Sequence, residues 1–145
     1  MEWRQGEFSV TTNPEDLDIE MIHGFLSTSY WAKGIPKAIV EKAARNSLSF
    51  GMYHHGRQIG FGRAITDQAT FAYLADVFIL PEFRGRGLGK WFISCVLAHP
   101  ELQGLRRWLL ATSDAHELYR RNGFAPLKKP ENFMEINILD IYQRT

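Results

Sequence analysis

Residues 74–90 read LADVFILPEFRGRGLGK and carry the clearest local pattern in the chain. Residues 73–80 are a short run of apolar, aromatic and β-branched side chains, as in a buried strand. Pro81 lacks an amide donor and ends the strand pairing. Beyond a glycine-rich loop, apolar residues recur at the spacing of an amphipathic helix: Leu88, Trp91, Phe92, Cys95 and Val96. The stretch predicts a strand, a basic glycine-rich loop and a helix in succession.

The loop between this strand and this helix is suited to bind an anion. The first amides of a helix have no partners inside it. Glycines let the backbone approach a ligand closely and adopt φ angles that other residues avoid. The start of a helix carries partial positive charge, to which Arg84, Arg86 and Lys90 add. We therefore expect a pyrophosphate or a similar anion at this loop.

The spacing of the loop differs from two common phosphate loops. A P-loop needs Gly-x4-Gly-Lys-Ser/Thr, but Trp91 follows Lys90 here. A Rossmann fingerprint needs Gly-x-Gly-x-x-Gly, but its last position, counted from Gly85, is Lys90. Counted from Arg84, the pattern is Arg-x-x-Gly-x-Gly after an apolar strand, and in this the sequence resembles the GNAT superfamily of acyl-CoA-dependent N-acyltransferases. The alternative is a glycine-rich turn on an ordinary strand–helix unit.

The resemblance implies two groups of residues that bind coenzyme A. The loop would bind the pyrophosphate, mainly through backbone amides, with Arg84, Gly85, Arg86, Gly87, Leu88, Gly89 and Lys90. The end of the preceding strand would bind the pantetheine arm and polarise the thioester through the backbone groups of Val77, Phe78 and Ile79. Acetyl-CoA is therefore the expected co-substrate.

Composition and length fit one globular domain over residues 1–145. The formal net charge of +1 gives no global field that would indicate nucleic acid or membrane as a partner. A single cysteine, Cys95, allows no intramolecular disulfide, which fits a reducing compartment. No membrane-length apolar run or signal peptide is present, so the expected location is cytoplasmic. His54 and His55 have no cysteine or carboxylate cluster near them in the sequence, and no metal site is expected.

The predicted elements follow the order strand, helix, helix, three strands, helix, strand, helix, strand. Their expected bounds are 8–12, 16–26, a helix from Pro36, 48–53, 58–65, 73–80, 88–99, 108–112, 115–122 and 133–141, with Asp114 capping the last helix. This is the element order of the GNAT fold, an α/β fold. That fold has a mixed, mostly antiparallel sheet of six to seven strands and about four helices, and its splayed strands form the coenzyme A cleft.

Tyr119 is the candidate general acid. Residues 115–124, AHELYRRNGF, look like the GNAT signature in which a helix tyrosine, a few residues before Gly-Phe, protonates the departing sulfur. The alternative is a core tyrosine, since Tyr119 shares a helix face with Ala115 and Leu118. Both can hold, because a packed ring can present its hydroxyl to a cleft.

Asp76 is the candidate general base. It lies inside an apolar strand, where an ionised carboxylate is costly unless it is paired or faces water. Some GNAT enzymes use an acidic residue on this strand through water. The alternatives are a carboxylate paired with an arginine or capping a turn, and a water chain acting alone.

Tyr30 and Trp31 lie between the first two predicted helices, a region that forms one wall of the acceptor pocket in GNAT proteins. Aromatic rings there could hold an amine by cation–π contact. The alternative is a hydrophobic plug over the sheet.

The sequence therefore predicts an N-acetyltransferase that moves an acetyl group from acetyl-CoA to a primary amine by direct attack in a ternary complex. The acceptor would be an unidentified small-molecule or peptide amine, and a homodimer is one option for the oligomeric state. The rival interpretation is a non-catalytic acyl-CoA-binding sensor or regulatory module.

Overall fold

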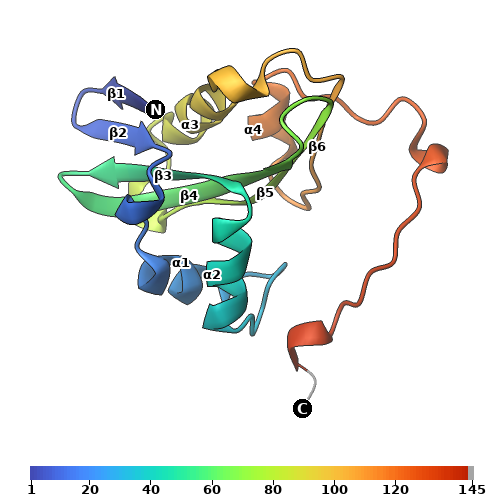
Figure 1. The fold of residues 1–145 in the computed structure, drawn as a ribbon, viewed down its shortest axis with the longest axis horizontal. Coiled ribbons are helices and arrows are strands. Elements are labelled where there is room, and N and C mark those ends of the chain that lie inside the picture. The colour runs from blue at the N-terminus through green and yellow to red at the C-terminus, as the bar shows by residue number, and fades with distance from the viewer. Residues whose placement is uncertain (144–145) are drawn as a thin grey trace.

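The computed structural model describes residues 1–143 (Figure 1). Its sheet has six strands in the order of the chain: β1 (Glu2–Gln5), β2 (Phe8–Thr11), β3 (Leu48–His54), β4 (Arg57–Thr66), β5 (Phe71–Ile79) and β6 (Arg107–Leu109). All neighbouring strands are antiparallel except β5 and β6, which are parallel. The sheet is therefore mixed and mostly antiparallel, as the resemblance implied.

Four helices cover the two faces of this sheet: α1 (Ile19–Leu26), α2 (Lys37–Arg45), α3 (Leu88–Leu97) and α4 (His116–Arg120). Figure 1 shows α1 and α2 on one face and α3 and α4 on the other. Ile22 and Val40 are buried with Phe78 of β5 in one apolar cluster, while Phe92 of α3 is buried with Ile79 of β5 in a second. Phe78 and Ile79 face opposite ways because successive strand residues do so.

The first strand, β1, was not predicted from the sequence. β1 pairs with β2 through a turn at Gly6, whose φ of +58° suits glycine. Its residues include Glu2 and Arg4 and are mostly exposed, so β1 carries no apolar alternation. A charged edge strand of this kind has no hydrophobic periodicity, and so it could not be predicted from the sequence pattern.

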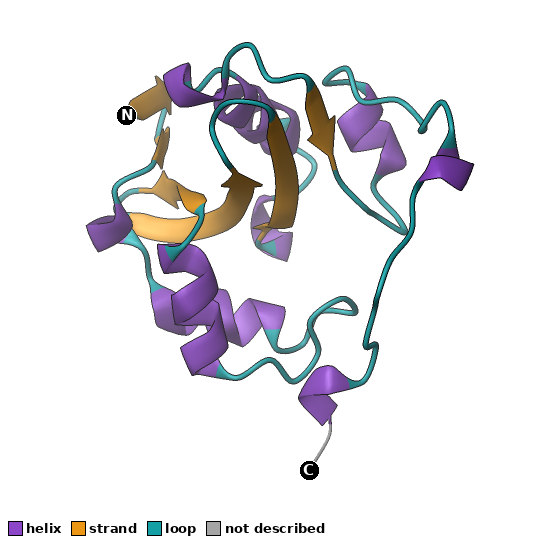
Figure 2. Ribbon diagram, turned by 45° about the vertical axis from the view of Figure 1, so that its right-hand side comes forward, coloured by secondary structure: helices purple, strands orange, loops and turns teal. Residues whose placement is uncertain are grey.

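The predicted strand over residues 133–141 is wrong. In the structure these residues have an open, extended course, and the only regular structure nearby is two short 3-10 turns, Pro130–Asn132 and Ile141–Gln143. Figure 2 shows this C-terminal arm, defined here as residues 128–143, running apart from the sheet. The alternation of apolar residues is present, but within the described chain no strand lies beside it.

Asp114 does not cap the last helix as predicted. The helix begins at His116, and Ala115 at its start has no side-chain cap. The Thr112 hydroxyl accepts from the Ala115 amide at 3.1 Å instead. The helix start is therefore held by a residue of the preceding loop, and the Asp114 side chain is left to line the neighbouring cavities.

Candidate active site

Strands β5 and β6 separate after a short parallel contact. Only Phe71–Tyr73 pair with Arg107–Leu109, and no strand pairs with the rest of β5 on that side among the described residues. Two cavities open along the separation. One, the loop cavity, is lined by the glycine-rich loop, residues 77–79 and Tyr119, with a volume of about 520 Å³. The other, the aromatic cavity, is lined by Tyr30, Trp31, Asp76 and Tyr119, with a volume of about 500 Å³.

A β-bulge shapes the centre of β5. Phe61 pairs with Phe78 and Arg63 with Ala75, so Asp76 and Val77 both stand opposite Gly62. Asp76 has a φ of +57°, a left-handed conformation that is costly for a residue with a side chain. A Cβ on Gly62 would lie 2.9 Å from a ring carbon of Phe92, so the facing strand has space only for glycine. The bulge turns the Asp76 carboxylate into the aromatic cavity.

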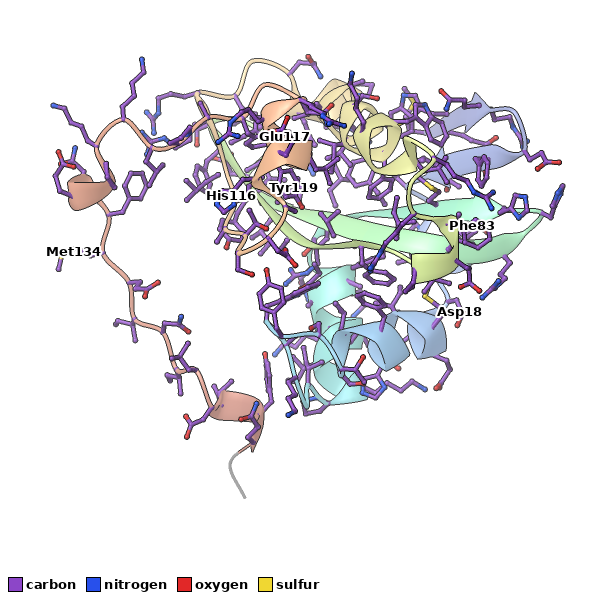
Figure 3. The ribbon with its side chains drawn as sticks, turned by 180° about the vertical axis from the view of Figure 1, so that it is seen from behind. Asp18, Phe83, His116, Glu117, Tyr119 and Met134 are labelled. Carbon is purple, nitrogen blue, oxygen red and sulfur yellow. The ribbon has the colours of Figure 1, made fainter. Side chains whose placement is uncertain are left out.

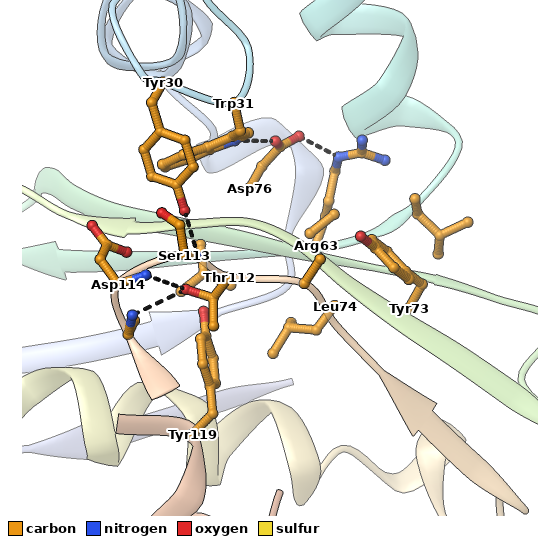
Figure 4. Close-up of a pocket in the computed structure, with 15 residues that line it drawn as sticks. Tyr30, Trp31, Arg63, Tyr73, Leu74, Asp76, Thr112, Ser113, Asp114 and Tyr119 are labelled. Atoms are coloured by element: carbon orange, nitrogen blue, oxygen red, sulfur yellow. Dashed lines mark hydrogen bonds and ion pairs between the residues drawn. The ribbon is translucent and has the colours of Figure 1, made fainter. Parts of the chain in front are cut away.

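The Asp76 carboxylate is bonded through both oxygens (Figure 4). Arg63 Nε donates to Oδ2 at 2.7 Å, and Trp31 Nε1 donates to Oδ1 at 2.9 Å. Arg63 also donates from Nη1 to the Ser47 hydroxyl at 2.8 Å. The structure thus shows the arginine pairing that was the alternative for Asp76. Acceptance of a proton by Asp76 stays a prediction.

Arg63 is a site residue that the sequence interpretation missed. It lies in β4 among buried neighbours, and its side chain is only 17% exposed. A single arginine inside an otherwise apolar strand was the available signal, because such a charge needs a partner when buried. The sequence could not show that the partner is Asp76.

Tyr119 lies between the two cavities and lines both. Its ring packs edge-on against Phe124, with centroids 5.9 Å apart, while its hydroxyl has no hydrogen-bond partner among residues 1–143. Burial, with smaller contributions from Tyr30 and Asp114, raises the pKa of Tyr119 to about 12. The phenol therefore holds its proton at neutral pH.

Tyr30 and Trp31 link the two separated strands across the aromatic cavity. The Ser113 amide, after β6, donates to the Tyr30 hydroxyl at 3.1 Å, and Trp31 bonds to Asp76 on β5. Their rings meet edge to face at 5.0 Å. Both remain exposed, Tyr30 by 59% and Trp31 by 42%. Binding of an amine by these two rings stays a prediction.

The glycine-rich loop has the backbone geometry of an anion cradle. Gly85 and Gly87 have φ angles of +80° and +77°, and Gly87 directly precedes α3. The first hydrogen bond of α3 runs from the Trp91 amide to Gly87. The amides of residues 88–90 have no acceptor within the described chain. Three unpaired amides at a helix start fit the oxygen atoms of a pyrophosphate.

The predicted cofactor-binding residues are not all placed alike. Every loop residue from Arg84 to Lys90 lines the loop cavity except Arg86, whose guanidinium lies over the Phe83 ring at 5.5 Å. Arg84 also donates from Nε to the Ile79 carbonyl at 3.0 Å, which ties the loop to the end of β5. The Phe78 ring stacks on Phe25 with centroids 4.0 Å apart.

A cluster that the sequence did not reveal lies on the β1–β2 side of the sheet. One oxygen of the Glu7 carboxylate lies 3.1 Å from His54 Nε2, and the other lies 3.5 Å from His55 Nε2. The sequence showed no carboxylate cluster beside these histidines, and in the structure a single carboxylate reaches them from the turn between β1 and β2. The potential ligand atoms lie within 4.8 Å of one another, and the two histidines lower the pKa of the Glu7 carboxyl.

This chain resembles known proteins in sequence. The profile of the acetyltransferase (GNAT) domain matches residues 45–126. A Gibberella zeae protein, provisionally named an acetyltransferase, is 34% identical over 83% of this chain and 80% of its own. In residues 1–143, no helix has the length and apolar character to cross a bilayer.

Two solved structures agree with these sequence matches. A Xanthomonas campestris protein, provisionally assigned as an acetyltransferase of the GNAT family, is 52% identical, with a TM-score of 0.91 over 94% of this chain and 97% of its own. A Mycobacterium tuberculosis protein solved in complex with CoA is 20% identical and shares the fold, with a TM-score of 0.65 over 82% of this chain and 72% of its own. With the domain profile, the relatives and the six-stranded mixed sheet in agreement, this chain belongs to the GNAT family of acetyltransferases.

Proposed function

We propose that this protein transfers an acetyl group from acetyl-CoA to a primary amine by direct attack in a ternary complex. One observation carries the proposal: Tyr119 lines both the cavity that contains the glycine-rich loop and the cavity lined by Tyr30, Trp31 and Asp76. A thioester approaching from the first and an amine approaching from the second would meet beside one protonated phenol.

The loop cavity supplies the binding groups for the donor. The unpaired amides of residues 88–90 would take the pyrophosphate, with Arg84 and Lys90 adding positive charge. Residues 77–79 line the same cavity, where no strand covers that side of β5 among the described residues. Their backbone groups would bond the pantetheine arm. Acetyl-CoA supplies an activated thioester, so no metal is needed for the chemistry.

Tyr119 acts as the general acid in this proposal. Attack by the amine nitrogen forms a C–N bond, the C–S bond breaks, and the departing sulfur takes the phenolic proton. Because the pKa of Tyr119 is raised to about 12, the phenol holds this proton at neutral pH. After attack, the new amide nitrogen gives its extra proton to water, and water returns a proton to the phenolate. No residue forms an acyl intermediate, because Cys95, the only cysteine, is buried on the other side of the sheet from the aromatic rings.

Asp76 assists removal of the proton from the amine. Its carboxylate faces the aromatic cavity and is accompanied there by Asp114. Arg63, in the same lining, offsets the charge of Asp76, so the Asp114 carboxylate and the two exposed aromatic rings are what favour a cationic ligand. The acceptor class is therefore a small-molecule or peptide amine that enters as the ammonium ion and loses its proton before attack.

The rival function, a non-catalytic acyl-CoA-binding module, predicts binding without turnover. Incubation of the protein with acetyl-CoA and a panel of polyamines, amino acids, aminoglycosides, arylamines and peptides separates the two. Release of free thiol, matched by an acetylated product in mass spectrometry, supports the transferase. Tight binding of coenzyme A with no thiol release above the protein-free rate for any amine contradicts it.

A further inference from the structure

The turns of two hairpins bring Glu7, His54 and His55 together, and we call these three residues the His–Glu cluster. Phe8 of β2 lies opposite His54 of β3 in an antiparallel register. Continuing that register by one step brings Glu7 beside His55, because antiparallel strands run in opposite directions. The pairing of β2 with β3 therefore places one carboxylate and two imidazoles at one end of the sheet.

The turn between β3 and β4 brings the two imidazole rings to the same carboxylate. His55 and Gly56 have φ angles of +50° and +79°, as the two central residues of a tight hairpin turn require. Histidine is one of the few residues with a side chain that is enriched in this left-handed region. Successive residues of a regular strand point to opposite faces, but here the centroids of the His54 and His55 rings are only 4.1 Å apart. Both Nε2 atoms thereby reach Glu7.

The spacing within the cluster is that of ligands around one small cation. The two oxygens of Glu7 lie 3.1 Å from His54 Nε2 and 3.5 Å from His55 Nε2. Two ligand atoms that a tetrahedral zinc ion binds at ~2.1 Å lie about 3.4 Å apart. One ligand atom from each of the three residues can be chosen so that all lie within 4.8 Å of one another. The side chains of His55 and Glu7 are 67% and 64% exposed, so small rotations can bring the ligand atoms closer.

His54 is the fixed member of the cluster. Its ring stacks on Phe8 with centroids 4.8 Å apart, and it lies 5.3 Å from the Phe83 ring. Within residues 1–143, neither His54 nor His55 has a hydrogen-bond or ion-pair partner other than Glu7. A neutral imidazole carries one ring proton, so both rings can keep that proton on Nδ1 and offer the lone pair of Nε2 to a metal.

Charge around the cluster favours a cation. Glu7 and His55 line an open hollow of about 480 Å³, and Glu2 and Asp16 add two more carboxylates to its lining. Arg4 is the one lysine or arginine in that lining, and it pairs with Glu2. Among the described residues, no lysine or arginine pairs with Glu7. The Glu7 carboxylate therefore has no permanent positive charge beside it, and a bound cation would supply one.

We propose that Glu7, His54 and His55 bind one Zn²⁺ ion, each through a single atom, with water completing the coordination. One carboxylate and two imidazoles form a ligand set that zinc takes in proteins. The ion would join the β1–β2 turn to the β3–β4 turn. It would thus hold β1, an edge strand that pairs only with β2 within the described sheet.

This zinc site is separate from the candidate active site. None of its three residues lines the loop cavity or the aromatic cavity. Figure 3 shows Phe83, whose ring His54 contacts, well apart from Tyr119. The ion therefore stabilises the hairpins and takes no part in acetyl transfer.

Calorimetric titration with zinc chloride gives the first test. The full chain is prepared without a histidine tag and freed of metal with EDTA, which dialysis then removes. We expect one zinc ion per chain. Glu7→Gln and His55→Ala should each weaken binding by more than roughly 100-fold, because loss even of a residue that only supports a metal ligand costs about 10–100-fold. His116→Ala removes another exposed histidine and is the matched control, expected to bind zinc as the parent does. A parent that binds no zinc overturns the proposal, as does Glu7→Gln or His55→Ala with unchanged affinity.

Hydrogen exchange on the parent alone gives a second test, which holds even if a variant misfolds. Because the folded chain alone assembles the site, zinc should raise the midpoint of thermal unfolding. It should also slow amide exchange in residues 2–11 more than in α2, which lies away from the site. Magnesium chloride at the same concentration is the control, since Mg²⁺ prefers oxygen ligands and should have neither effect. Zinc that leaves exchange in residues 2–11 unchanged, or that slows only another segment, overturns the proposal.

Discussion

Arg63 Nε and the Asp76 carboxylate lie 2.7 Å apart at the base of the aromatic cavity, one on β4 and the other at the bulge of β5. Their side chains are 17% and 13% exposed. The pair neutralises two charges that would otherwise be costly in this position. It also fixes one carboxylate oxygen while the other accepts from Trp31. Asp76 thus has a structural role that any catalytic test must separate from proton transfer.

Asp76→Asn is expected to lower kcat/KM at neutral pH, because an amide keeps the shape but cannot accept the amine proton. Stability should fall by about 1.5–3 kcal/mol, the range for a hydrogen bond to a charged group. Thermal unfolding measures the second effect and the pH–rate profile the first. Ser47→Ala is a control, since it removes a hydrogen bond of Arg63 and leaves the carboxylate intact. If Asp76→Asn keeps both the neutral-pH rate and the ascending limb of the pH–rate profile, Asp76 has only a structural role.

Tyr119→Phe is expected to reduce the rate of acetyl transfer by about 10²-fold or more, the scale of a lost general acid. KM for acetyl-CoA should change little, because the hydroxyl acts chiefly in the transition state. Single-turnover measurement avoids masking by product release. Tyr53→Phe removes another tyrosine hydroxyl, one bonded at 2.7 Å to the Asp16 carbonyl, and should leave the rate unchanged. Equal single-turnover rates for Tyr119→Phe and the parent would rule out the acid role.

Gly87→Val is expected to abolish detectable binding of coenzyme A in calorimetry while the fold persists. Gly87 has a φ of +77°, and a side chain in the left-handed region costs roughly 1–2 kcal/mol, so the loop must change shape. A Cβ there would touch nothing within 4 Å, so the effect would come from backbone strain and from blocked approach of the ligand. Gly104→Val is the matched control, with a φ of +75° and equally open surroundings away from the cavity. Unchanged affinity in folded Gly87→Val contradicts the assignment of the loop.

Arg84→Ala should weaken coenzyme A binding less than Gly87→Val does. A charge near a helix start contributes about 0.3–1 kcal/mol, which corresponds to a few-fold change in Kd. Arg84 also bonds to the Ile79 carbonyl, so Arg84→Lys, which retains charge but loses the fixed Nε donor, separates the two contributions. A loss of binding as complete as in the glycine variant would mean that the side chain, and not the backbone, is the main ligand.

Cys95 is expected to react with thiol reagents only as fast as the protein opens. Burial raises the pKa of the Cys95 thiol from 9.0 to about 11. Because the folded pKa lies above the unfolded one, the associated stability is fully present below pH 9 and declines as the pH rises towards 11. Denaturant titrations at pH 8 and pH 10.5, with Cys95→Ala as reference, measure the decline. Rapid labelling of the native protein at pH 8 would contradict the burial.

The sequence predicted those features that depend on local chemistry. The glycine loop follows from the spacing of residues 84–90, and α3 follows from its apolar periodicity. The pairing of Asp76 did not follow, because the bulge decides which way that carboxylate points, and only the fold brings Arg63 to it. Residues 133–141 do alternate apolar and polar side chains as a strand does. Such alternation indicates that a segment suits a sheet, but it does not show that a neighbouring strand is present to pair with it. Strand β1 was not predicted for the opposite reason: it pairs with β2, but its sequence has no alternation of apolar residues.

The bulge at Asp76 also makes the number of residues in β5 a fixed quantity. Leu74 packs on the α3 side of the sheet and so do Val77 and Ile79, although an unbroken strand would turn even and odd positions to opposite faces. The extra residue resets the alternation. Deleting one residue here would send the Phe78 ring away from Phe25 and turn Ile79 towards α1. The loss or gain of one residue in this strand would therefore turn the side chains of its second half to the opposite faces of the sheet.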